Sequence, residues 1–266
     1  MWPKIVLMLI FSVVIYCVLA HRWKAPGTDC GTLHKASMTG DLVQVRSLIA
    51  AGADVNAYFD GAPPLHFAAM NGHLEIVSEL IENGAQINAA SIDGEGITAL
   101  HIAAFLGNAG LVSLLLKNGA DVDLLTSHAE SAVCSAARGG HKDVFRLLRE
   151  HGASVSGLDS DGDNMLVQAV FENCVPAVKI LLEDGFDPNC LAGNGKSRPL
   201  EIATVTHALN GDSSLVKLLL KSGADPNLAG IHGQPISDTI HNVAKFTGNR
   251  DLLQILIDHE TRQSIK

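Results

Sequence analysis

The chain has 266 residues, of which 47% are hydrophobic and only 5% are aromatic, and Ala, Leu and Gly are abundant. This profile can fill a sizeable core of close-packed helices and disfavours a β-sandwich, whose strands prefer β-branched and aromatic side chains. The formal net charge of −9 disfavours nucleic acid as a ligand, because a phosphate backbone demands a basic surface. An acidic surface would also repel anionic lipid, so the charge favours a basic protein partner.

An apolar run near the N-terminus is typical of an export signal. It extends from Ile5 to Ala20, follows Lys4 and precedes His21. Its 16 residues match the apolar core of a signal peptide and are few for a helix that spans a bilayer. Val18 and Ala20 place small residues where a signal peptidase needs them for a cut before His21.

A second interpretation of the same segment is an uncut signal anchor. Trp2 and Trp23 stand 21 residues apart, which is about 31 Å of helix, so one aromatic ring would lie at each bilayer interface. Residues 1–24 are therefore predicted to be either a signal peptide or a signal anchor. Both place the rest of the chain in the periplasm, soluble after cleavage or tethered through residues 5–20, or else in a secretory-pathway lumen.

Beyond this segment, two phrases recur in a constant order along the chain. The first is Pro-Leu-His-Phe-Ala-Ala at residues 64–69 and Ala-Leu-His-Ile-Ala-Ala at residues 99–104. The second, a closing phrase similar to Gly-Ala-Asp-Val-Asn, begins at Gly52, Gly84, Gly119, Gly152, Gly185 and Gly223. The leucine of the first phrase recurs, as Leu or another apolar residue, every 32 to 36 residues. This spacing indicates seven units of about 33 residues, a period typical of stacked repeats.

The pattern resembles the ankyrin-repeat family over about residues 29–260. The resemblance implies an all-α solenoid of about seven helix-turn-helix units with β-hairpin-like fingers, spanning residues 25–266 behind the N-terminal apolar helix. The units are expected at about residues 29–57, 58–90, 91–125, 126–158, 159–192, 193–228 and 229–260. One unit cannot bury its apolar face alone, so neighbouring units must stack.

Local signals inside the units agree with stacked helix pairs. Proline in the first turn of a helix sacrifices no hydrogen bond, and glycine after a helix, such as Gly119, is expected in a left-handed cap. One apolar face at helical spacing is formed by Leu74, Ile76, Val77, Leu80 and Ile81.

The last two units depart from the common length. Four additional residues stand between Ala203 and Gly211 in the sixth unit, which is about one further helical turn. The seventh unit is longer again between Thr239 and Gly248 and lacks the closing phrase. We therefore expect it to be a terminal cap with Asp258 facing water, together with the two residues that follow, His259 and Glu260.

No catalytic, metal or cofactor site is predicted. The resemblance implies that His34, His66 and His101 bond the backbone of a neighbouring finger, and the other histidines and the five cysteines show no zinc-ligand spacing. The acidic run at residues 159–164 departs from an EF-hand loop, because Asn164 stands where that loop needs glycine. The motifs of serine hydrolases and P-loops are missing from the sequence as well. An enzyme on a repeat scaffold is therefore the least favoured interpretation.

The family that the chain resembles binds partners through its finger tips and the last residues of each first helix. The corresponding groove positions are Met70, Asn71, Phe105, Leu106, Arg138, Gly139, Phe171 and Glu172, and the finger positions are Phe59, Asp60, Glu95, Ile97, Ser127, His128, Ser160, Asp161 and Asp163. Several are large and apolar although the fold does not require it, and acids flank them, which is typical of a protein interface. The alternative is that these side chains pack between units.

These observations favour a non-enzymatic protein-binding module that is a monomer when unbound. Its expected partner is another protein, and the preferred role is that of an exported inhibitor, or immunity protein, which neutralises a secreted toxic enzyme such as a phospholipase. The alternative role is a membrane-tethered scaffold that organises an envelope or lumenal complex.

Overall fold

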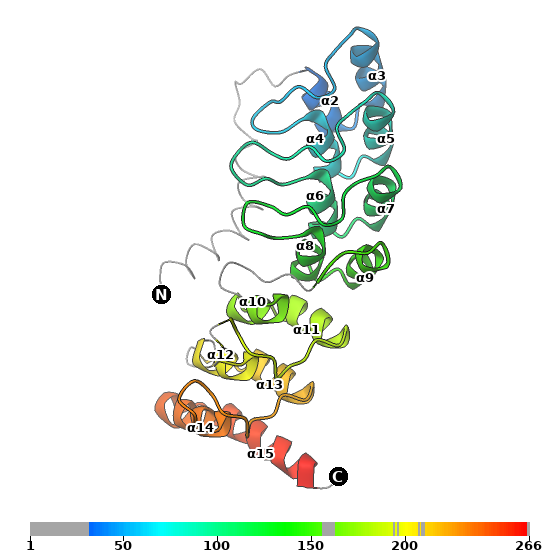
Figure 1. Cartoon of the computed structure of the whole chain (residues 1–266). Coiled ribbons are helices and arrows are strands. Elements are labelled where there is room, and N and C mark those ends of the chain that lie inside the picture. Colours follow the sequence, from blue (N-terminus) through cyan, green and yellow to red (C-terminus); the bar gives the residue numbers. More distant parts are fainter. Residues whose placement is uncertain are drawn as a thin grey trace. The chain divides into compact units, whose positions relative to one another are not determined.

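The computed structural model of the chain describes residues 32–155, 163–193, 195, 197–206, 208 and 211–264 (Figure 1). The predicted signal or anchor segment at residues 1–24 lies outside the described residues. Among the residues that are described, none belongs to a helix with the length and apolar character needed to cross a bilayer. The chain divides into two compact units, Met1–Ser154 and Val155–Lys266, and each is described on its own.

Unit 1 is a stack of four helix pairs joined by projecting loops (Figure 1). The pairs are α2 (Thr32–Thr39) with α3 (Leu42–Ala50), α4 (Pro64–Met70) with α5 (Leu74–Glu82), α6 (Ala99–Phe105) with α7 (Ala109–Lys117), and α8 (Ala132–Arg138) with α9 (Lys142–Glu150). The first helices α2, α4, α6 and α8 contact one another in that order and form an inner layer, and the second helices α3, α5, α7 and α9 form an outer layer.

Unit 2 repeats the same arrangement with three pairs. They are α10 (Met165–Phe171) with α11 (Val175–Glu183), α12 (Pro199–Thr206) with α13 (Ser214–Lys221), and α14 (Ile236–Thr247) with α15 (Arg250–Ser264). Extended pairing in the described residues is limited to three isolated bridges in the loops, Phe59 with Ala62, Leu125 with Ser131 and Ala229 with Pro235. The predicted all-α fold of stacked helix pairs with hairpin-like fingers is confirmed.

The core consists of the apolar positions of the repeated phrases. Leu65 and Leu100 are buried, and the alanine pairs that follow, such as Ala68 and Ala69, have no exposed surface. These small side chains let adjacent inner helices approach closely, and each fully buried leucine contributes about 1.5–3 kcal/mol to stability. Three of the five residues of the predicted apolar face of α5 are buried, whereas Leu74 is exposed and Ile81 is partly exposed at the edges of that face.

The glycine that opens each closing phrase has the left-handed backbone expected of a helix cap. Gly119 follows α7 with φ +89°, and its N–H donates to the carbonyl of Leu116 while the N–H of Ala120 donates to that of Leu115. These bonds satisfy carbonyl groups that the helix end would otherwise leave unpaired. Asn173 takes the same left-handed region, φ +55°, at the position between helices that glycine holds in other repeats, a place where asparagine is better tolerated than most residues.

The last helix pair differs as the sequence predicted. α14 has 12 residues, against seven in α4, α6, α8 and α10, and it ends at Gly248 with φ +68°. Asp258 and Glu260 on α15 are exposed, while His259 is partly buried. α12 has eight residues, and because residues 207, 209 and 210 lie outside the described part of the chain, a full additional turn there stays a prediction.

Candidate protein-binding surface

Each finger of unit 1 leads into the N-terminal end of an inner helix, and the closing phrases hold successive repeats in register. The Asn56 side chain donates from Nδ2 to the carbonyl of Gly84 (3.0 Å), and its Oδ1 accepts the N–H of Gln86 (2.8 Å). Asn88 repeats the second bond one unit later, to the N–H of Asp121 at 2.9 Å. The last residue of the closing phrase therefore ties each repeat to the next.

Three buried histidines connect the inner helices to the fingers. The Nε2 atoms of His34, His66 and His101 lie 2.8, 2.8 and 3.1 Å from the carbonyl oxygens of Ala57, Ile97 and Glu130, respectively. Because a carbonyl oxygen can only accept, Nε2 carries the proton in each ring. The bonding that the family resemblance implied for these histidines is therefore present: the carbonyl groups of Ile97 and Glu130 belong to fingers, and that of Ala57 stands directly before one.

Burial keeps these three rings neutral. Desolvation lowers the pKa of His66 to about 4, although its bond to the Ile97 carbonyl and the charge of Asp93 oppose the shift. Desolvation likewise lowers the pKa of His34 and of His101. Nδ1 of His101 also accepts the hydroxyl proton of Thr98 at 2.8 Å, an arrangement that protonation of Nδ1 would break.

Three fingers form the tip of the candidate surface: the second finger comprises residues 58–62, the third residues 91–97 and the fourth residues 125–131. In the second, Phe59 and Ala62 exchange backbone hydrogen bonds of 3.0 and 3.1 Å around a turn in which Asp60 and Gly61 both have positive φ. The third finger is longer, because 12 positions separate its closing Asn88 from Leu100.

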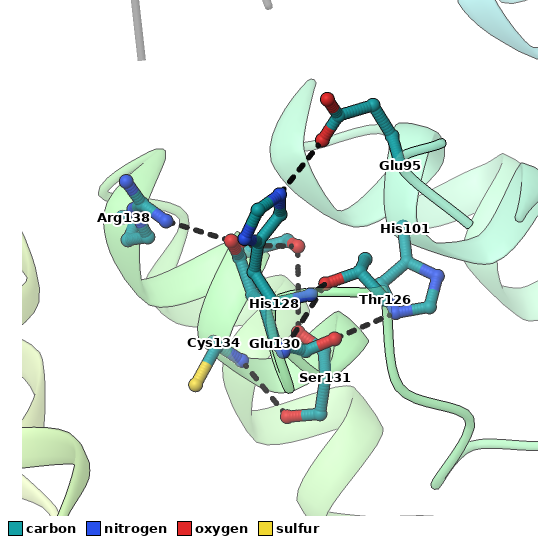
Figure 2. A network of polar contacts seen from close by, with 9 residues as sticks. Glu95, His101, Thr126, His128, Glu130, Ser131, Cys134 and Arg138 are labelled. Carbon is teal, nitrogen blue, oxygen red and sulfur yellow. Dashed lines mark hydrogen bonds and ion pairs between the residues drawn. The ribbon is translucent and has the colours of Figure 1, made fainter. Parts of the chain in front are cut away.

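A polar network organises the fourth finger and the start of α8 (Figure 2). The Glu130 carboxylate accepts the hydroxyl of Ser135 at 2.9 Å and pairs with Nη1 of Arg138 at 2.6 Å. The N–H of Glu130 donates to Thr126 Oγ1 at 3.2 Å, and its carbonyl accepts the N–H of Thr126 at 2.9 Å. Arg138, predicted as a groove residue, thus pairs with a residue of the fourth finger, and only 21% of its side chain is exposed.

An exposed side-chain contact joins the third and fourth fingers. Nε2 of His128 lies 3.2 Å from the Glu95 carboxylate, and in Figure 2 the two side chains point toward each other. The N–H of Ser127 also donates to the Glu95 carbonyl at 2.8 Å. His128, a predicted binding residue, therefore lies at the surface and in contact with its neighbouring finger.

The other predicted groove residues of unit 1 differ in accessibility. Leu106, the cap residue of α6, is 42% exposed, and Asn71 is exposed as well. Phe105 and Met70 at the ends of α6 and α4 are partly buried. Gly139 admits the close approach of α6, since a Cβ there would lie 2.6 Å from the carbonyl oxygen of Phe105.

The predicted finger residues also divide between packing and exposure. Asp60 is exposed at the tip of the second finger, and Ile97 is partly buried in the third. Phe59 packs against the ring of His34 with 5.6 Å between ring centroids, so it contributes to packing between repeats, which is the alternative that the sequence left open.

The remaining predicted residues belong to unit 2 or lie outside the described residues. Phe171 and Glu172 are partly buried at the end of α10 in unit 2. Asp161 and Ser160 lie outside the described residues. The assignment of these positions to a binding surface stays a prediction.

Sequence reasoning missed the most exposed apolar residues of the fingers. Ile92 in the third finger is 70% exposed and Leu125 in the fourth is 57% exposed. The sequence feature that could have pointed to them is the number of residues between a closing phrase and the next leucine. This number is larger at the third finger than at the second. The separation between repeats showed that residues had been inserted, but not that they would lengthen a finger.

The described residues contain no cluster of three or more His, Cys, Asp or Glu side chains that could hold a metal ion. Burial raises the pKa of the Cys134 thiol to about 12, so this cysteine stays protonated and unreactive at neutral pH.

Comparison with known families covers most of the chain. The family model described as "Ankyrin repeats (3 copies)" matches residues 33–126 and again 108–192, and the model described as "Ankyrin repeat" matches residues 199–231. No curated protein matches the chain.

Proposed function

Because the chain belongs to the ankyrin-repeat family, whose members are generally non-enzymatic protein-interaction modules, we propose that unit 1 holds a protein partner against its fingers and inner-helix ends. The observation that carries this proposal is the exposure of Leu106 at the cap of α6. The helix pair does not need a large apolar side chain at a cap, and a partner that covered it would gain about 25 cal/mol per Å² of apolar surface removed from water.

The finer role that we propose is that of an exported inhibitor of a secreted enzyme. The net charge of −9 supports a basic partner, and the apolar run from Ile5 to Ala20 supports export to the periplasm. A rigid surface is suited to inhibition, because it can cover an active site without losing much conformational entropy on binding.

A membrane-tethered scaffold is the second candidate. The separation of Trp2 and Trp23 supports it, since an uncut anchor would hold the repeats beside the membrane. The two roles differ in what happens to the partner's activity: an inhibitor abolishes it at one chain per partner molecule, whereas a scaffold leaves it unchanged.

Affinity purification of the full chain from its native cell, followed by mass spectrometry, would identify the partner. We expect Leu106→Ser to raise the Kd of the purified partner at least tenfold, which corresponds to about 1.4 kcal/mol. Val43→Ser is the matched control, because Val43 is an apolar residue of α3 that is 81% exposed on the outer layer. An unchanged Kd for Leu106→Ser, or equal losses for both variants, would contradict the proposed surface.

A further inference from the structure

Each finger of unit 1 from the second to the fourth exposes one large apolar side chain. Tyr58 is 41% exposed, and it joins Ile92 and Leu125 in a series of one residue per successive finger. Single exposed apolar residues are ordinary, but a series on neighbouring elements is typical of an interaction surface.

The third finger is rigid although its Ile92 side chain is exposed. The N–H of Ser91 donates to the Ile97 carbonyl (2.8 Å), and the N–H of Ile97 donates to Ser91 Oγ (3.0 Å). Oδ1 of Asp93 accepts the Ser91 hydroxyl (2.8 Å) and the N–H of Glu95 (3.0 Å). Backbone and side chains thus close the finger on itself.

Neighbouring fingers hold the third finger from both sides. The N–H of Ile92 donates to the Gly61 carbonyl at 2.8 Å, and the Glu95 carbonyl accepts from Ser127. Gly96 allows this approach, because a Cβ there would lie 3.1 Å from Ser127 Oγ and 3.2 Å from its backbone nitrogen. Ile92 is therefore presented on an ordered backbone, and a partner would lose little free energy in ordering it.

The charge around this apolar series has one sign. The three fingers contain four acidic residues and no Lys or Arg. Arg138 neutralises Glu130, and the other three acids are Asp60, Asp93 and Glu95. Asp60 and Asp93 are exposed, so the potential at the finger tips attracts cationic groups and repels anionic lipid.

We propose that the second, third and fourth fingers dock a protein segment that carries Lys or Arg beside large apolar side chains, with Ile92 as the central anchor. The inference rests on the proposed function and adds to it the chemistry of the partner. Adjacent helices pack about 8–10 Å apart, so three successive fingers span about 16–20 Å. An extended segment of about six residues covers this distance at about 3.3 Å per residue.

Selection of binders from a random 12-residue peptide display library tests this proposal on the full chain. The enriched peptides should carry net positive charge and at least one large apolar residue. Ile92→Ser should raise their Kd at least tenfold, measured by fluorescence anisotropy. Asp93→Asn should raise it severalfold and weaken its dependence on salt, because salt screens exposed charges. Val43→Ser should leave it unchanged, and all three variants should keep the wild-type melting temperature.

The failures of the two proposals are distinguishable. Acidic or uncharged enriched peptides, a library that yields no binder, or a Kd insensitive to Ile92→Ser would overturn the finger inference. Binding lost through Leu106→Ser but not through Ile92→Ser would do so while leaving the proposed function intact. Binding to vesicles that contain phosphatidylserine, abolished by Ile92→Ser, would replace the protein segment with a lipid surface.

Discussion

Unit 1 should lose stability on mild acidification because its buried histidines resist protonation. The variant His66→Gln measures how much one of them contributes to this pH dependence. The pKa of His66 is lowered from 6.5 to about 4 by burial. The folded state therefore binds fewer protons than the unfolded state between pH 6.5 and pH 4. The stabilising contribution is fully present above pH 6.5 and is lost as the pH falls toward 4.

The size of this effect follows from the shift. One pKa unit corresponds to 1.36 kcal/mol. The contribution of the neutral His66 ring to the free energy of unfolding therefore falls by about 2 to 3 kcal/mol between pH 7.5 and pH 4.5. Glutamine keeps a side-chain N–H that can donate to the Ile97 carbonyl, but it does not titrate. The free energy of unfolding of His66→Gln should therefore fall less steeply with pH than that of the wild type.

Urea unfolding of the wild type and the variant at half-unit intervals from pH 7.5 to pH 4.5 measures this difference. His241→Gln, at an exposed residue of α14, is the control for the exchange of histidine for glutamine itself. Equal slopes for His66→Gln and the wild type would refute the argument that burial of this ring opposes its protonation.

Four further predictions follow from the same structure. Gly119→Val should cost about 1–3 kcal/mol because of its left-handed backbone, which a lower thermal midpoint would show and an unchanged midpoint would contradict. Gly139→Ala should destabilise unit 1 by about 1–3 kcal/mol, whereas Gly110→Ala should not, since a Cβ at Gly110 would lie 3.6 Å from Asn108 Oδ1 and from Leu74 Cδ1, which is an ordinary contact distance. Phe105→Ala should cost about 2 kcal/mol of partner affinity with unchanged far-ultraviolet circular dichroism; unfolding with unchanged affinity would assign this ring to the core. A reporter enzyme that is active only after export, fused behind Lys24, should be active; activity from a cytoplasmic reporter alone would contradict export.

Much of the fold was predictable because the same type of residue recurs at the same place in several repeats. Leu65 and Leu100 are buried, and Gly119 has the left-handed conformation that the closing phrase predicts. Each of these residues stands in a phrase that recurs in the same order, and stacking requires the same small or apolar residue each time. The 12-residue α14 was predictable in the same way, from the distance to Gly248.

The surface was less predictable because it depends on contacts between side chains of different repeats. Arg138 occupies a groove position, but its pairing with Glu130 depends on rotamers that spacing does not specify. Phe59 occupies a finger position, yet its ring packs on His34 from the preceding repeat. The exposure of Ile92 depends on the length and internal bonds of one finger, which differ from those of its neighbours.

Hydrogen exchange of the full chain with and without its purified partner tests the binding surface most directly. The surface proposed for unit 1 predicts slower exchange in residues 91–97 and 125–131 and at the end of α6, with α3, α5 and α7 unchanged. Protection confined to those outer helices, with the fingers exchanging as in the unbound chain, would contradict it.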